Sequence, residues 1–156
     1  MIPKYIILHC SATEDTGTAS WEAIRDFHMN MRGWRDIGYH YGIEEFGDEL
    51  VLLRGRRPFD MGAHCRAAGR NRDSLGFCVV GDYDEEPPSE ERYTAVVAVL
   101  ASLCFMFGID PDNVRGHREY EDNKTCPGLM WDLEKTRRDI RYAILHDLNL
   151  GDYLAI

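Results

Sequence analysis

The chain is short of positive charge, because 18 lysines and arginines stand against 27 aspartates and glutamates, for a formal net charge of −9. Nonspecific binding to nucleic acid and attachment to anionic membranes both depend on basic patches, so we expect neither. The sequence also lacks a run approaching the ~20 apolar residues of a membrane-spanning helix. Residues 1–8 are too short for a signal peptide, so we expect the protein to be cytoplasmic where it is made.

Cysteines are few and odd in number: Cys10, Cys65, Cys78, Cys104 and Cys126. Their spacing is not that of a disulfide framework, so we expect free thiols in a reducing compartment. Cys78 and Cys104 should fill the apolar core, because free cysteine is among the most buried residue types. Cys10 follows His9 on a predicted strand, and alternation should send the two side chains to opposite faces.

Hydrophobic patterning predicts one domain of α/β class over residues 1–156. Strands are expected at residues 4–10, 37–46, 50–53, 74–80 and 113–116, and helices at 21–31, 90–107 and 130–146. Ser20 is a predicted N-cap of the first helix; Ser89 or Glu90 begins the second, and Gly108 ends it. Loops or irregular segments are expected at 11–20, 54–73 and 82–88, and a packed or frayed tail at 148–156.

Two histidines and one cysteine form the most informative set in the sequence. His9 lies at the end of a β-rich segment, His117 follows a short predicted strand, and Cys126 lies in the next loop. Two imidazoles and a thiolate are a typical ligand set for catalytic zinc, with the fourth position left to water. A lone histidine at a strand end is more often an ordinary residue, but the three together favour a metal site.

Conspicuous motifs surround these three residues. They are HCSAT at residues 9–13, GWRDIGYHY at 33–41, GAH at 62–64, NRDSLG at 71–76, GHRE at 116–119 and KTCPG at 124–128. In this unbroken order they resemble the type 2 N-acetylmuramoyl-L-alanine amidases, which include the amidase-type phage lysozymes and the peptidoglycan-recognition proteins. The resemblance covers residues 5–130 and implies a single domain with a central mixed β-sheet flanked by helices.

The resemblance also implies an activity and a set of functional residues. It implies a zinc enzyme that cuts the amide bond between N-acetylmuramic acid and L-alanine of peptidoglycan, as a phage or prophage endolysin does. By motif position, His9, His117 and Cys126 are the expected zinc ligands, and Tyr39 and Lys124 the expected catalytic residues. A lysine can stabilise an oxyanion, and a tyrosine can donate a hydrogen bond and help to move a proton.

Several of these residues also have structural interpretations. Tyr39 could belong to an aromatic cluster on a strand, and a loop lysine such as Lys124 is by default solvated. His64 falls where the family places a histidine at the substrate groove, and substrate contact and structural hydrogen bonding are equal alternatives for it. His28 is expected to be structural. The stretch 64–71 is longer than the family pattern, with Cys65 among the added residues.

We expect zinc as the cofactor and peptidoglycan or a muropeptide as the partner, with a monomer that acts on the cell wall after release. Two other functions are open: a non-catalytic peptidoglycan-binding module, and a cytosolic amidase that recycles muropeptides. Lys124 and Cys126 argue against the binding module, because the phage-type members use that lysine and the recognition proteins often replace it. Nothing in the sequence supports regulatory binding to an intracellular protein.

Overall fold

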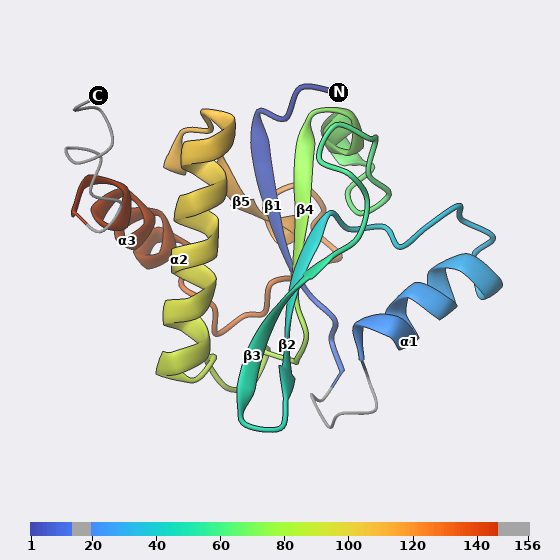
Figure 1. The fold of residues 1–156 in the computed structure, drawn as a ribbon, viewed down its shortest axis with the longest axis horizontal. Coiled ribbons are helices and arrows are strands. Elements are labelled where there is room, and N and C mark those ends of the chain that lie inside the picture. The colour runs from blue at the N-terminus through green and yellow to red at the C-terminus, as the bar shows by residue number, and fades with distance from the viewer. Residues whose placement is uncertain (14–19, 147–156) are drawn as a thin grey trace, which may run out of the picture.

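The computed structural model describes residues 1–13 and 20–146, which build a mixed sheet with helices on both faces (Figure 1). The sheet has the order β3-β2-β4-β1-β5, with β1 (Tyr5–Cys10), β2 (Tyr41–Phe46), β3 (Glu49–Arg54), β4 (Ser74–Val79) and β5 (Val114–Gly116). The helices are α1 (Trp21–Asp26), continued by the π-helix η1 (Phe27–Met31), then α2 (Glu90–Phe107) and α3 (Leu133–His146). Three short 3₁₀ helices are η2 (Ala67–Arg72), η3 (Pro111–Asn113) and η4 (His117–Glu119). The predicted α/β class and flanked mixed sheet are confirmed.

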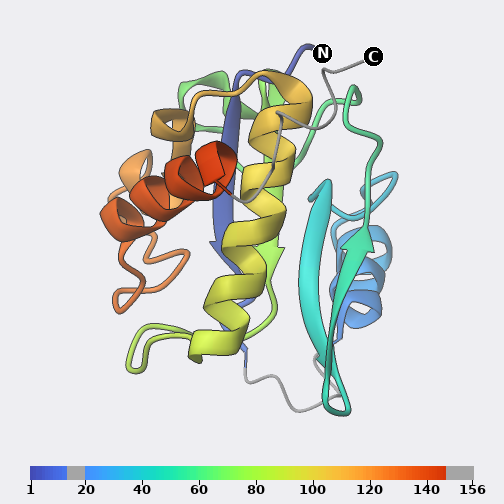
Figure 2. The ribbon, with the colours of Figure 1, turned by 60° about the vertical axis from the view of Figure 1, so that its left-hand side comes forward.

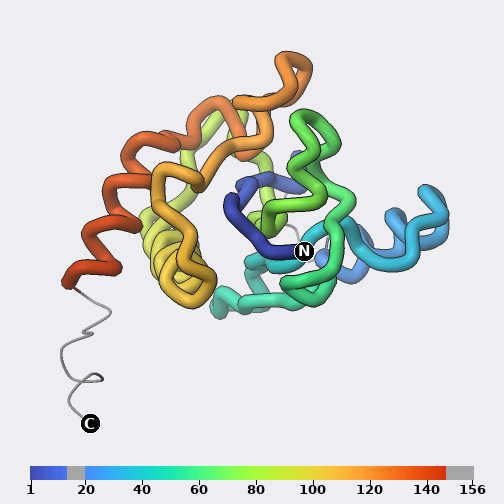
Figure 3. Tube along the Cα trace, turned by 90° about the horizontal axis from the view of Figure 1, so that it is seen from above, coloured from blue at the N-terminus to red at the C-terminus, as the bar shows by residue number. Residues whose placement is uncertain are grey.

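Strand pairing follows from the connections. β2 and β3 form an antiparallel hairpin, whereas β1 is parallel to both β4 and β5, and β2 is parallel to β4. Parallel strands need crossover connections, and α2 lies in the one that leads from β4 to β5, on either side of β1. Seen from above, α1 lies on the opposite side of the strands from α2 and α3 (Figure 3). The carboxyl ends of β1, β4 and β5 therefore point the same way.

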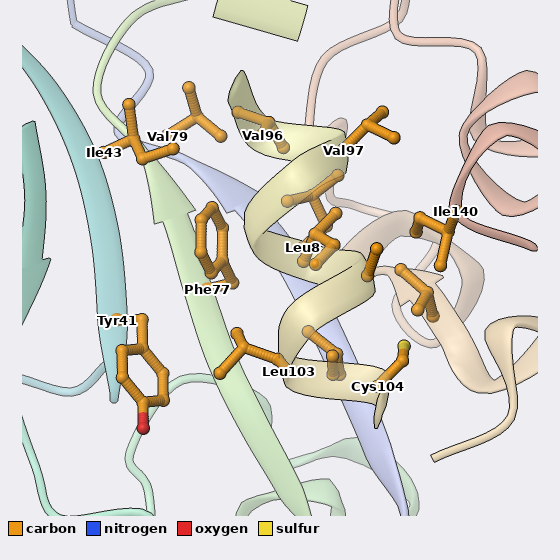
Figure 4. Packing of buried hydrophobic residues seen from close by; sticks show 14 of the residues in the cluster. Leu8, Tyr41, Ile43, Phe77, Val79, Val96, Val97, Leu103, Cys104 and Ile140 are labelled. Carbon is orange, nitrogen blue, oxygen red and sulfur yellow. The ribbon is translucent and has the colours of Figure 1, made fainter. Parts of the chain in front are cut away.

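Alternation along the strands separates the two faces of the sheet. Leu8 and Phe77, paired in register on β1 and β4, pack beneath α2 in the main apolar core (Figure 4). Their neighbours His9 and Cys78, also paired in register, point to the face that α1 covers. Figure 2 shows α2 and α3 side by side on the first face. The main core therefore occupies one face, and the other carries a smaller apolar cluster around Trp21 beside the polar residues of the site.

Truncating the centre of the core should destabilise the protein strongly. Phe77 is fully buried on the central strand β4. Phe77→Ala therefore removes a buried aromatic ring with all its packing contacts and leaves a cavity. We expect the free energy of unfolding to fall by about 3–5 kcal/mol. Denaturant titration of wild type and variant measures this, and an unchanged midpoint would contradict the packing described.

The helix ends agree closely with the predicted caps. Ser20 Oγ accepts a hydrogen bond from Ala23 N at 3.2 Å, and Ser89 Oγ accepts one from Arg92 N at 3.3 Å. Gly108 adopts the left-handed conformation, with φ of 63°, and ends α2 as predicted. Side-chain capping of the free N–H groups explains why these boundaries could be predicted from local sequence.

Two predicted boundaries were wrong. The strand expected from residue 37 begins only at Tyr41, because Gly38 N donates to the ring of His28 rather than to a neighbouring strand. The last helix begins at Leu133 rather than near residue 130, because Asp132 Oδ1 accepts from Lys135 N and caps it there. The predicted tail at 148–156 lies outside the described residues, as do residues 14–19 of the first predicted loop.

Within residues 1–13 and 20–146, no helix combines the length and the apolar character needed to cross a membrane.

Candidate metal centre and active site

Strand register brings the two predicted histidine ligands together. Leu8 on β1 pairs with Gly116 on β5, so the next residues, His9 and His117, lie side by side at the carboxyl ends of these strands. Their ring centroids are 4.6 Å apart. Crevices at the carboxyl ends of parallel strands are the usual place for ligand sites in α/β sheets.

Cys126 completes the set from a loop. Its Sγ, one ring nitrogen of His9 and one ring nitrogen of His117 all lie within 4.8 Å of one another. The two histidines are buried and Cys126 is half-buried. Two imidazoles at strand ends and a thiolate from a loop suit the tetrahedral preference of zinc. The donor set therefore fits the metal that the sequence predicts.

A second histidine, His64, holds the ring of His9. Its Nε2 lies 3.1 Å from His64 Nδ1, and His64 Nε2 in turn lies 3.5 Å from Ser74 Oγ. Burial lowers the pKa of His9 to about 4, which favours the neutral imidazole that a metal requires. Burial, and then the nearby His9, also hold the pKa of His64 well below its usual value. With Nε2 engaged, Nδ1 is the nitrogen of His9 that remains for a metal.

The ring of His117 is also held at Nε2, but by a carboxylate rather than by a second histidine. Its Nε2 lies 3.1 Å from Glu121 Oε1, and Cys65 lies close enough to form a second possible ligand group with these two residues. Burial by itself lowers the pKa of His117, but hydrogen bonds with Cys126, Cys65 and Glu121 outweigh burial and raise the pKa to about 10. Metal binding must displace the corresponding proton.

The Cys126 thiol lies in an environment that favours its thiolate. A hydrogen bond from Cys10 Sγ, at 3.7 Å, holds the pKa of Cys126 well below its usual value, and His117 and His9 act in the same sense. The thiolate is the form that binds metal.

All five cysteines are free, as predicted, and Cys78 and Cys104 are buried. Cys10 packs in the main core beneath α2, as its alternation with His9 predicts, but its Sγ also reaches Cys126 at the edge of that core.

Tyr39 lies beside the histidines rather than within a strand. Its ring centroid is 5.1 Å from that of His9, and burial raises the pKa of the phenol well above its usual value. The hydroxyl therefore stays protonated and able to donate at neutral pH.

Tyr39 also lines a pocket of about 340 Å³ together with Ser11, Thr13, Ala23, Ile24, Phe27 and His28. His28 itself accepts from Gly38 N and stacks on Trp34, which fits a structural role.

Lys124 and His64 differ in how firmly they are placed. Lys124 lies on the loop before Cys126, where its backbone N donates to Glu121 O at 3.0 Å and its side chain is exposed. His64 is half-buried and lines a second pocket, of about 440 Å³, with Trp34, Ala63, Cys65, Arg66, Asn71 and Glu121. The structure thus gives His64 the bond to His9 that one of the two sequence alternatives required.

Comparison with known proteins identifies the family. The family model described as N-acetylmuramoyl-L-alanine amidase matches residues 1–129. This chain belongs to the N-acetylmuramoyl-L-alanine amidase family. The resemblance seen in its motifs is therefore confirmed.

Relatives of this family member include animal and phage proteins. Peptidoglycan-recognition protein LB of Drosophila melanogaster is 35% identical over 132 residues, which cover 80% of this chain and 54% of that protein. The chain thus spans about half the length of the Drosophila protein. The endolysin of Escherichia phage T7 is 32% identical over 127 residues, which cover 80% of each chain.

Solved structures share its fold. The N-acetylmuramoyl-L-alanine amidase LysC from Clostridium intestinale has a TM-score of 0.76 at 25% identity, covering 90% of this chain and 87% of that one. A variant of Drosophila peptidoglycan-recognition protein LB in complex with tracheal cytotoxin has a TM-score of 0.67 at 32% identity, covering 82% and 77%. The fold expected from the motifs is that of these proteins.

Sequence reasoning missed two contacts at the centre. Glu121 reaches His117 because η4 turns the chain after β5 and brings residues four apart together. The i,i+4 spacing of the two residues is a signal for this contact only if the segment forms a helical turn, which the sequence did not predict. The contact of Cys10 with Cys126 joins residues more than a hundred positions apart, and no local pattern reveals it.

Proposed function

We propose that this chain, over residues 1–156, is a zinc-dependent N-acetylmuramoyl-L-alanine amidase of phage or prophage endolysin type. It hydrolyses the amide bond between N-acetylmuramic acid and L-alanine in peptidoglycan. The observation that carries the proposal is the convergence of His9, His117 and Cys126 at the carboxyl ends of β1 and β5. Family membership supports the bond that is cut, and the N/N/S donor set supports zinc as the metal.

The residues around the donor set have distinct tasks in this proposal. When bound, a catalytic zinc polarises a carbonyl oxygen and makes water a stronger nucleophile. Tyr39, whose ring lies beside that of His9, donates a hydrogen bond from its protonated hydroxyl to the reacting centre and helps to move a proton. The Lys124 ammonium stabilises the negative charge that develops on the carbonyl oxygen. Its exposed loop position lets it approach a substrate from the solvent side.

Two pockets supply the surface for an extended substrate. One is lined by Tyr39 and His28, and the other by His64 and Arg66. We propose that these pockets hold the portions of peptidoglycan on either side of the scissile amide, with His64 contacting the substrate while it holds His9. The tracheal cytotoxin complex of the Drosophila relative supports a ligand of the peptidoglycan class.

The phage relatives support the endolysin assignment. The T7 endolysin matches this chain over four fifths of its own length. We propose that this chain is likewise made in the cytoplasm, acts as a monomer, and reaches the cell wall after release.

The recognition proteins among the relatives favour a second candidate, a peptidoglycan binder without turnover. Lys124 and the intact donor set argue for the enzyme.

A metal-restoration assay on purified sacculi separates these candidates. Chelator-treated protein should release no soluble material, and stoichiometric zinc should restore the release. Binding to sacculi without release, with zinc present, would identify the non-catalytic binder. Faster hydrolysis of soluble muropeptides than of sacculi would instead identify a recycling amidase.

A further inference from the structure

The loop after β5 holds a carboxylate against one of the candidate ligands. Glu121 Oε1 lies 3.1 Å from His117 Nε2, and the exposed fractions of the two side chains are 28% and 9%. Backbone bonds fix the geometry on both sides: Glu121 N donates to His117 O at 3.3 Å, and Lys124 N donates to Glu121 O at 3.0 Å. The backbone that carries Glu121 is therefore held in a turn beside His117, and the carboxylate contacts the ring from there.

The contact determines which edge of the imidazole faces the donor set. An imidazole carries its two nitrogens on different edges, and a neutral ring has one N–H and one bare nitrogen. The ionised Glu121 carboxylate has no hydrogen to donate, so it can only accept a hydrogen bond. It therefore selects the tautomer of His117 that carries the proton on Nε2. Nδ1 is then bare and available to the group that His117 forms with His9 and Cys126.

We infer that Glu121 is a positioning residue of the metal centre, fixing the tautomer and the ring orientation of His117. The inference rests on the proposed function, because it presupposes that His117 binds zinc. His9 is held at the same ring atom, Nε2, by the neutral His64. Both imidazoles are thus anchored on the far edge, but only Glu121 adds a negative charge near the metal. Ligand histidines commonly donate their second N–H to such a carboxylate, which orients the ring and raises its basicity.

The alternative role for Glu121 is that of a direct ligand. Cys65, His117 and Glu121 form a group whose donor atoms also lie within 4.8 Å of one another. The two roles make opposite demands on Glu121, because a positioning carboxylate faces the ring N–H and a ligand faces the ion. Replacing it therefore has different spectroscopic consequences in the two cases.

The test compares Glu121→Ala and Glu121→Gln with the control Asp122→Asn. Asp122 is an exposed carboxylate on the same loop, so its variant removes one nearby charge without touching His117. We expect chelator competition to show zinc affinity ~10–100-fold weaker in Glu121→Ala. Glu121→Gln should recover part of the loss, because its amide oxygen still accepts from Nε2. Asp122→Asn should match the wild type.

The absorption spectrum of the cobalt-substituted protein supplies a readout independent of activity. At saturating Co²⁺, Glu121→Ala should show the wild-type bands, because a positioning residue leaves the ligand set intact. A changed band pattern would make Glu121 a ligand and overturn the inference. Wild-type zinc affinity in a folded Glu121→Ala, with its thermal unfolding checked in the metal-free state, would overturn it too. If the wild type itself binds no zinc, the proposed function fails, and the inference fails with it.

Discussion

His117→Ala should lose zinc and amidase activity together. The ring lies at the carboxyl end of β5, and its donor atom is within 4.8 Å of those of His9 and Cys126, so its removal leaves two of three protein ligands. Cys126→Ser should behave in the same way, because a hydroxyl is a poor substitute for a thiolate ligand. Metal analysis of the purified proteins should give about one zinc per wild-type chain and little in either variant.

The matched control is His146→Ala. His146 is an exposed histidine at the end of α3, so its loss changes the histidine count without touching the donor set. It should keep both zinc and activity. Full zinc occupancy in both His117→Ala and Cys126→Ser would contradict the ligand assignment.

Tyr39→Phe and Lys124→Ala should separate catalysis from metal binding. Neither residue belongs to the donor set, so both variants should bind zinc as the wild type does. Each removes one group that stabilises charge or moves a proton, and loss of one oxyanion donor typically lowers the rate ~10²–10³-fold. Steady-state hydrolysis of a soluble muropeptide, measured beside zinc content, gives both quantities.

Two conservative controls accompany these variants. Tyr41→Phe removes a hydroxyl from a tyrosine two residues along the chain, on the strand that packs against α2 (Figure 4). Lys4→Ala removes an exposed lysine at the start of the chain. Both should hydrolyse at the wild-type rate. Unchanged rates in Tyr39→Phe and Lys124→Ala would contradict the proposed catalytic roles of these two residues and would assign catalysis to the metal centre alone.

The elements that the sequence predicted well are those with local causes. The ends of α2 follow from the Ser89 cap and the left-handed Gly108, and the buried strand β4 follows from its continuous apolar run. The boundary of β2 was predicted wrongly, because it depends on a contact between Gly38 and the distant ring of His28. Local patterns carry no information about such tertiary bonds.

The candidate site divides in the same way. Motif order was enough to predict that His9, His117 and Cys126 converge, and strand register then explains why the two histidines, so far apart in sequence, meet. The anchors of the two imidazoles were not predictable from the motifs alone. The motifs gave His64 two equal interpretations without indicating its contact with His9, and they gave Glu121 none. Side-chain orientation across loops depends on the folded backbone rather than on residue type.

The most direct measurement of the central claim is a single digest of purified peptidoglycan labelled for two products. An amidase frees the amino group of L-alanine and leaves the glycan strands intact, whereas a glycosidase, which normally works with two carboxylates, creates new reducing ends. We predict new L-alanine amines in proportion to zinc-loaded enzyme, with reducing ends unchanged from the blank. New reducing ends without new amines would contradict the account.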